Sequence, residues 1–263
     1  MPHTRLIARL DIKAPNLIKG VHLEGLRKLG DPNEFARRYY ETGVDELLYM
    51  DIVASLYERN SLTDVIRYTA QNIFIPFTVG GGIRSVDDVE AILLAGADKV
   101  AINTAAVRRP QLISEAARRF GSQCVVLSIE AKRRPGGEGW EAYTDNGREH
   151  TGLDVVDWAR QAAALGAGEI LLTSVDQEGT RKGMDIQLIS AVSDVVCVPV
   201  ITSGGVGEPK HVGEALRNGA HAVAVADALH YNRCSVQDLH QAMRDAGGSV
   251  RTIPGIDDLS EAC

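Results

Sequence analysis

One unit occurs twice in this sequence, half a chain apart, and this repeat constrains the fold more than any other feature. The first copy is PFTVGGGIRSVDDVEAILLAGADKVAINTAA, which begins at Pro76, and the second is PVITSGGVGEPKHVGEALRNGAHAVAVADA, which begins at Pro199. The two copies align without a gap at an offset of 123 residues, from Pro76 to Pro199. A chain that repeats a unit at half its length is expected to consist of two related halves.

Each copy has the pattern of a strand, a glycine turn, a helix and a second strand. In the first copy an apolar run leads into Gly80-Gly81-Gly82, and Ser85 then has Asp88 three residues later, which is the pattern of a capped helix start. Glycines at a turn leave backbone N–H groups uncovered, and a helix N-terminus attracts negative charge. The unit therefore predicts a phosphate site.

The whole chain alternates short apolar strands with amphipathic helices. Eight strand–helix units in about 250 residues are the size of a (β/α)8 barrel. A doubly wound open sheet is the competing fold, but it gives no reason for a half-chain repeat. We therefore predict an α/β fold, a single-domain (β/α)8 TIM barrel with a two-fold half-barrel repeat, over residues 1–250, followed by a tail over 251–263. The strands are expected near 6–12, 45–51, 75–80, 98–102, 123–130, 168–174, 198–203 and 221–226, and the helices near 31–42, 61–72, 85–95, 109–119, 153–165, 185–192, 208–218 and 235–246.

Composition excludes several classes of function. The 263 residues carry a formal net charge of -7, which argues against general nucleic-acid binding but leaves phosphorylated ligands possible, because backbone amides can hold a phosphate. The four cysteines and seven histidines show no metal-ligand spacing, so we expect no metal. Because the sequence has no signal-peptide pattern and no stretch as long as a membrane span, we expect a cytoplasmic protein without membrane contact.

Two connections are unusually long, and both follow the carboxyl end of a strand, where barrels of this kind place their chemistry. The connection from Lys13 to Gly30 is interpreted either as a mobile lid or as an idle insertion. The connection from Lys132 to Thr151 is expected to form a hairpin, with Trp140 to Tyr143 as one arm and a turn at Asn146-Gly147.

Two carboxylates end opposite strands of the predicted barrel. Asp11 ends the first strand and Glu130 ends the fifth, each in the pattern Asp/Glu-x-Lys. Facing each other across the mouth, they could act as general acid and general base. The alternative is a salt bridge in each half, to Lys13 and Lys132, which alternation along a strand would permit. We favour the catalytic interpretation.

Other polar residues are expected at the two ends of the barrel. Asp51, Asn103, Thr173, Ser174 and Asp176 lie at strand ends, where they could bind ligand hydroxyls. At the opposite end, four charged residues each start a strand, and by pattern alone they are interpreted as solvated strand starts rather than as a salt-bridged ring. These four residues are Arg5, Glu46, Lys99 and Glu169.

At this point the motifs match a known family. LDIK at the first strand, VGGGIRSVDDVEAILLAGADKVAIN, FGSQCVV, TGLDVVDWA, LGAGEILLTSVDQEGT and SGGVG make the chain resemble the cyclase subunit of imidazole glycerol phosphate synthase, over essentially residues 5–245. The resemblance implies a histidine-biosynthesis lyase without a cofactor. It implies a glutaminase partner docked at the N-terminal face, whose ammonia passes through the barrel to a bis-phosphorylated formimino ribotide. The implied products are imidazole glycerol phosphate and aminoimidazole carboxamide ribotide.

The resemblance also implies roles for individual residues. Asp11 matches the first catalytic aspartate, and Lys19 matches the mobile first loop. Gly81, Gly82, Asn103 and Thr104 match one phosphate site, while Gly179, Gly204, Gly205 and Asp227, at the end of strand eight, match the other; Asp51 and Thr173 are further substrate-binding candidates. Arg5, Glu46, Lys99 and Glu169 match a charged ring that gates ammonia entry, which reverses the interpretation from pattern alone.

Three residues depart from the family pattern. The second catalytic aspartate is replaced by Glu130, which moves the carboxyl group by about one methylene. The residue two before Asp11, commonly cysteine in the family, is Arg9, a cation that could pair with Asp11 or Glu130. Asp227 stands where a small hydroxyl residue is usual and aligns with Thr104 of the first copy. Since a carboxylate repels phosphate, it casts doubt on the second phosphate site.

These departures leave alternatives open. In the first, the chain is a true cyclase. In the second, it is a paralogue that has lost cyclase activity and channels ammonia to another acceptor, such as a nucleotide sugar, with a partner enzyme. In the third, it is a sugar-phosphate isomerase with the same barrel, against which the four gate residues argue.

Overall fold

A closed parallel barrel forms the centre of the molecule. The structure is a computed structural model that describes residues 3–52, 62–136 and 138–252. Each of eight strands pairs in parallel with the next, and the last pairs with the first, which closes the barrel. The predicted (β/α)8 fold and its eight strands are confirmed. The strands are β1 (Arg5–Lys13), β4 (Glu46–Asp51), β5 (Phe77–Gly80), β6 (Lys99–Ile102), β7 (Val125–Arg133), β10 (Glu169–Ser174), β11 (Val200–Ser203) and β12 (Ala222–Val225).

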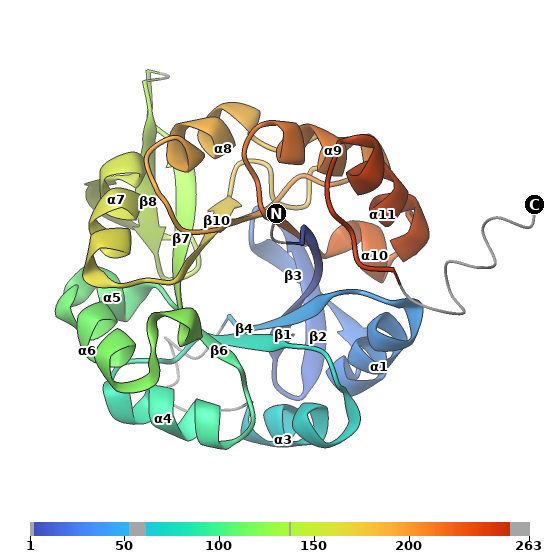
Figure 1. Ribbon diagram of the computed structural model, residues 1–263, viewed down its shortest axis with the longest axis horizontal. Coiled ribbons are helices and arrows are strands. Elements are labelled where there is room, and N and C mark those ends of the chain that lie inside the picture. Colours follow the sequence, from blue (N-terminus) through green and yellow to red (C-terminus); the bar gives the residue numbers. More distant parts are fainter. Residues whose placement is uncertain (1–2, 53–61, 137, 253–263) are drawn as a thin grey trace, which may run out of the picture.

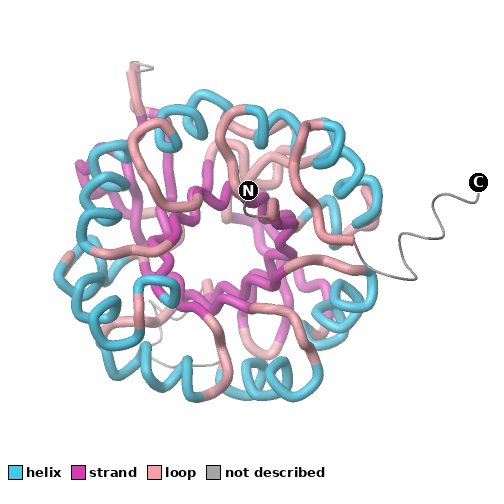
Figure 2. Tube along the Cα trace, viewed as in Figure 1, coloured by secondary structure: helices cyan, strands magenta, loops and turns pink. Residues whose placement is uncertain are grey.

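Helices surround this barrel as a ring, as Figures 1 and 2 show. The eight predicted helices are found within a few residues of their expected bounds. They are α1 (Pro32–Thr42), α3 (Thr63–Asn72), α4 (Val86–Leu94), α6 (Gln111–Phe120), α7 (Val155–Leu165), α8 (Ile186–Ser193), α9 (Pro209–Arg217) and α11 (Val236–Asp245). Short helices α5 (Thr104–Arg108) and α10 (Asp227–His230) follow β6 and β12, and the 3-10 turn η1 (Ser122–Cys124) precedes β7.

Local sequence explains where these helices begin and end. Ser85 and Asp88 form a capping box at the start of α4, as their spacing predicted. Asp31 and Asp154 cap α1 and α7, which end at the left-handed glycines Gly43 and Gly166. These two helices are equivalent in the two halves, so the repeat extends to the caps.

The two-fold repeat is visible in the element bounds. The helices α4 and α9, and the strands β6 and β12, each span equivalent residues at the 123-residue offset found in the sequence. The same offset relates β4 to β10. In β1 and β7 the equivalent residues follow from strand register: Asp11 pairs with Met50, and Glu130 pairs with Thr173, the counterpart of Met50. Asp11 and Glu130 are therefore equivalent positions of the two halves.

Both long connections fold as strands. The hairpin predicted after β7 is confirmed: β8 (Trp140–Thr144) and β9 (Glu149–Asp154) pair with each other, and β8 pairs with β7. The connection after β1 is also a hairpin, which the sequence did not predict. Its strands are β2 (Asn16–Val21), which pairs with β1, and β3 (Glu24–Gly30).

The buried apolar residues form two groups. The larger group fills the space between strands and helices, as expected for this fold. The smaller group, here called the luminal cluster, alternates with the larger one along the strands and therefore points into the barrel. The luminal cluster consists of Ile7, Ile18, Leu48, Met50, Ile52, Ala101, Val126, Leu171, Ile201, Ala222 and Ala224.

Within the described residues, no helix is long and apolar enough to cross a membrane. The predicted tail boundary at residue 251 is not tested, because residues 253–263 lie outside the described residues.

Candidate active site

Asp11 and Glu130 lie buried at the carboxyl ends of β1 and β7. Their exposed fractions are 4% and 5%. Burial alone would raise the pKa of Asp11, but the guanidinium of Arg9 at 2.9 Å and the ammonium of Lys19 at 3.9 Å hold that pKa below its usual range. Asp11 is therefore an ionised carboxylate at neutral pH.

Glu130 has the opposite environment. Burial raises the pKa of Glu130 to about 7, although the N–H of Gly147 donates a hydrogen bond of 2.6 Å to Oε2 and acts against the shift. Gly147 belongs to the turn of the β8–β9 hairpin, so that hairpin positions the second carboxyl group. Two equivalent carboxyls whose pKa values are shifted in opposite directions are suited to separate proton-donor and proton-acceptor roles.

The alternative of a salt bridge to the nearby lysine in each half is wrong. Asp11 pairs with Arg9 and Lys19 instead of Lys13, whose side chain is exposed. The Nζ of Lys132 lies 4.6 Å from the centre of the Tyr143 ring.

The side chain of Arg9 extends from β1 to β10 and β11 near the carboxyl ends of these strands, and it is only 2% exposed. Its Nε donates to Oδ1 of Asp11, and its Nη1 donates to Oγ1 of Thr173 at 2.9 Å and to Oγ of Ser203 at 3.2 Å. Of the two pairings that the sequence allowed for Arg9, the structure shows the one with Asp11. Thr173, a substrate-binding candidate, is thus engaged with Arg9.

The first cavity lies above β4 to β7 and has a volume of about 680 Å³. Glu130 lines it together with five predicted binding residues, Asp51, Gly81, Gly82, Asn103 and Thr104. Arg84, Arg108, Arg109 and His150 also line it and were not among the predicted residues. The first predicted phosphate site and one of the two predicted catalytic carboxyls therefore share a cavity.

Gly81 shows why this loop requires glycine. Its φ is +97°, and a Cβ atom there would lie 2.2 Å from the carbonyl oxygen of Asp51. Gly82 also has a positive φ, of 73°. The backbone thus approaches the end of β4 more closely than a side chain would allow, and α4 begins directly afterwards.

A second cavity, of about 560 Å³, lies beneath the β2–β3 hairpin. It is lined by the predicted residues Lys19, Gly179 and Asp227, and by three arginines that sequence reasoning missed, Arg27, Arg181 and Arg233. Nε of Arg233 donates to Oδ1 of Asp227 at 2.8 Å. The carboxylate that was expected to repel phosphate is therefore paired with a cation inside a cavity rich in arginine.

Lys19 belongs to β2 of this hairpin, and its side chain is buried. Its ammonium forms an ion pair with Glu178 and lies near Asp11, and the N–H of His22 donates to the carbonyl of Glu178 at 2.8 Å. The predicted residues Gly204 and Gly205 lie behind the loop that carries Glu178: a Cβ on Gly205 would lie 2.0 Å from the carbonyl oxygen of Gly183. They do not line the second cavity among its described residues.

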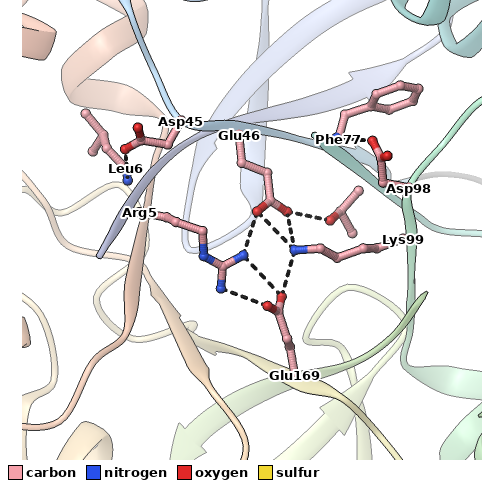
Figure 3. Close-up of polar contacts among 9 residues, drawn as sticks. Arg5, Leu6, Asp45, Glu46, Phe77, Asp98, Lys99 and Glu169 are labelled. Atoms are coloured by element: carbon pink, nitrogen blue, oxygen red, sulfur yellow. Dashed lines mark hydrogen bonds and ion pairs between the residues drawn. The ribbon is translucent and has the colours of Figure 1, made fainter. Parts of the chain in front are cut away.

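At the opposite end of the barrel, the four charged strand starts form a ring across the axis. Figure 3 shows their side chains pointing toward one another. Glu46 is only 1% exposed, and its carboxylate forms ion pairs with Arg5 at 2.6 Å and with Lys99 at 3.0 Å. The carboxylate of Glu169 forms ion pairs with the same two cations, at 2.8 Å and 3.0 Å. The interpretation as solvated strand starts is wrong, and the ring that the resemblance implied is present.

No group of three or more His, Cys, Asp or Glu side chains that could hold a metal ion occurs among the described residues.

The chain was compared with known proteins. Residues 5–235 match the family described as Histidine biosynthesis protein. Curated relatives include three proteins named imidazole glycerol phosphate synthase subunit HisF. The one from Legionella pneumophila is 69% identical over 208 residues, which are 79% of this chain and 98% of the relative. The one from Synechococcus is 52% identical over 254 residues, 95% of this chain and 96% of the relative. The one from Mycobacteroides abscessus is 48% identical over 253 residues, 94% of this chain and 98% of the relative.

These relatives do not support the alternative of a paralogue that has lost cyclase activity. Two of them extend over nearly the whole chain. The chain belongs to the family of HisF subunits of imidazole glycerol phosphate synthase.

Proposed function

We propose that this chain is the cyclase of an imidazole glycerol phosphate synthase. It combines ammonia with a bis-phosphorylated formimino ribotide, and the products are imidazole glycerol phosphate and aminoimidazole carboxamide ribotide. The observation that carries the proposal is the order of groups along the barrel axis. The charged ring closes one end, the luminal cluster fills the middle, and the two carboxyls lie at the other end. An apolar lumen of this kind suits a small neutral nucleophile.

Asp11 and Glu130 divide the proton transfers. Asp11, ionised beside Arg9 and Lys19, accepts a proton from the attacking nitrogen. Glu130, with a pKa of about 7, is partly protonated at neutral pH and donates a proton to the departing group. The longer glutamate side chain is fixed by the N–H of Gly147, which offsets part of its additional freedom.

The two cavities hold the two phosphates. In the first cavity, the glycine loop at Gly81-Gly82 and the start of α4 offer backbone N–H groups, with Arg84 beside them. In the second, Lys19 and three arginines supply positive charge. Glu130 lines the first cavity, and Asp11 lies 3.9 Å from Lys19, which lines the second. A substrate that spans both cavities would therefore place its reacting centre near the two carboxyls.

A glutaminase subunit docks against the charged ring and supplies the ammonia. The same end of the barrel exposes Phe74, which follows α3 and is 76% exposed, and Leu94, the last residue of α4, which is 82% exposed. The turn after α4 meets α3 there, because Gly96 lies directly against Ala70. Two large exposed apolar side chains next to this contact are typical of a surface that a partner covers.

The test is turnover by the purified chain with the bis-phosphorylated ribotide and ammonium chloride, followed as imidazole glycerol phosphate. We expect turnover of the order of 1 s⁻¹, in the ordinary range for enzymes, and its loss by at least about a hundredfold in Asp11→Asn. Ribotide binding without product formation would contradict the proposal.

A further inference from the structure

One layer of the barrel departs strongly from the two-fold repeat. Arg9 on β1 is equivalent by register to Ser128 on β7. Its hydroxyl partners Thr173 and Ser203 are equivalent to Met50 and Gly80 of the first half, at the offset of 123 residues. One half of this layer therefore carries a cation and two hydroxyls that hold it, while the other half carries a methionine, a glycine and a serine.

The guanidinium lies between the luminal cluster and the two carboxyls. In β1 the inward residues follow the order Arg5, Ile7, Arg9 and Asp11, from the charged ring to the mouth. Arg9 reaches from β1 to β10 and β11, past the small side chain of Ala224 on β12, the strand between β1 and β11. The guanidinium therefore lies beside the path from the luminal cluster to the two carboxyls.

Space for such a molecule exists on the other side of the layer. The first cavity is lined by Met50 and Ala101, which both belong to the luminal cluster, and by Glu130. The described residues that line the second cavity include no member of the luminal cluster. The luminal cluster thus borders the first cavity on the side of the barrel opposite the bonds of Arg9.

Arg9 stays protonated although it is buried. Burial acts to lower the pKa of Arg9, but the neighbouring carboxylates Asp11, Glu178 and Glu130 raise it above its usual value. Other charged or titratable groups near this network are Lys19 on β2, Asp145 in the β8–β9 turn and His230 on α10. Burial lowers the pKa of His230 to about 3, so this histidine is neutral. Two cations, Arg9 and Lys19, thus face two ionised carboxylates and the partly protonated Glu130.

We propose that Arg9 is a selectivity residue that excludes ammonium ion from the reaction chamber and admits only neutral ammonia from the lumen. This inference rests on the proposed function. A fixed guanidinium repels a second cation at short range in a medium of low dielectric, whereas neutral ammonia experiences no such repulsion. If Arg9 were neutral, Asp11 and Glu178 would outnumber the remaining cation Lys19, and the chamber would attract ammonium or potassium.

The kinetic test compares variants that remove the charge, Arg9→Met and Arg9→Gln, with Arg9→Lys, which keeps it. The KM for total ammonium chloride is measured from pH 6 to pH 8. In the wild type and Arg9→Lys, only the neutral form enters, so this KM should fall about tenfold for each pH unit. In Arg9→Met and Arg9→Gln, ammonium ion also enters the chamber. The KM for total ammonium chloride should then fall less than about threefold for each pH unit. The slope of KM, rather than kcat, is the readout, because all three changes also disturb Asp11.

A second measurement needs no turnover. The melting temperature is measured in equal concentrations of ammonium, potassium and choline chloride. Arg9→Met and Arg9→Gln should melt about 3 °C higher in ammonium or potassium than in choline, because the unpaired carboxylates bind the small cation. The wild type, Arg9→Lys and the exposed-site control Arg37→Met should show no such difference.

The outcomes separate the two proposals. An unchanged KM slope together with no cation-specific stabilisation in the neutral variants would overturn the role of Arg9 and leave it a purely structural arginine. Wild-type protein that makes no imidazole glycerol phosphate would overturn the proposed function, while the melting experiment would still decide whether Arg9 excludes cations.

Discussion

At the scale of single residues, the burial of Glu130 places a titration near neutral pH inside the barrel. The folded pKa of Glu130 is about 7, against an ordinary value of 4.5. Between these values the folded chain holds a proton that the unfolded chain has released, so stability must fall as pH rises through this window. By linkage the loss is about 3 kcal/mol between pH 4.5 and pH 7.

We predict that Glu130→Gln removes this loss, because an amide does not titrate and can still accept the N–H of Gly147. Urea unfolding at half-unit intervals from pH 4.5 to pH 8 should give a wild-type free energy of unfolding that declines by about 3 kcal/mol more than that of the variant. Glu41→Gln, at an exposed carboxylate, should behave as the wild type does. Parallel curves for the wild type and Glu130→Gln would refute the shifted pKa.

A second residue-scale prediction concerns Asp227 and Arg233, which line the second cavity as a pair. Arg233→Met removes a cation and leaves Asp227 unpaired beside the phosphate, so KM for the ribotide should rise about tenfold or more, with a smaller change in kcat. The double variant Asp227→Ser/Arg233→Met removes the repelling carboxylate too, and its KM should lie closer to that of the wild type. If the double variant instead has a higher KM for the ribotide than Arg233→Met, Asp227 itself contacts the substrate.

At the scale of elements, the β2–β3 hairpin is joined to the barrel by the pairing of β2 with β1 and by polar contacts with the loop after β10. The polar contacts are the buried ion pair of Lys19 with Glu178 and two hydrogen bonds from His22, to the carbonyls of Glu178 and Val175. We predict that Glu178→Gln loosens the hairpin, because breaking one side of a buried pair costs about 3–5 kcal/mol unless the partner reaches water. Amide hydrogen exchange over residues 16–30 should become at least about tenfold faster.

The matched control for this prediction removes both charges. In Lys19→Met/Glu178→Met no charge is left buried without its partner, so protection of residues 16–30 should return toward the wild-type level. Unchanged exchange in Glu178→Gln would show that pairing of β2 with β1 is enough to hold the hairpin down.

The elements of this fold differ in how well the sequence predicted them. Elements that repeat, such as α4 and α9, were predicted closely, because period and glycine turns were seen twice. The β2–β3 hairpin was not predicted, since its pairing depends on tertiary contact with β1 and on residues without a strand pattern. The roles of Arg27, Arg181 and Arg233 were also missed, because a long side chain reaches a cavity from positions that carry no local signal. Likewise, nothing in the sequence showed that Arg233 pairs with Asp227.

At the scale of the whole molecule, the proposed function assigns separate roles to the two ends of the barrel. The charged ring and the exposed Phe74 and Leu94 lie at one end, and both carboxyls lie at the other. Substrate chemistry and partner docking should therefore be separable by mutation.

We predict that Phe74→Asp/Leu94→Asp uncouples the two ends. Turnover with ammonium chloride should stay within about twofold of the wild type, because surface changes far from a site rarely alter it. Glutamine-dependent turnover in the presence of the glutaminase should fall about a hundredfold, because losing two buried apolar anchors and burying two charges weakens docking by roughly 3 kcal/mol or more. Both rates are measured on the same preparation, so the ammonia-dependent rate controls for folding. If both rates stay unchanged, the partner docks elsewhere; if both fall together, this end of the barrel stabilises the fold itself.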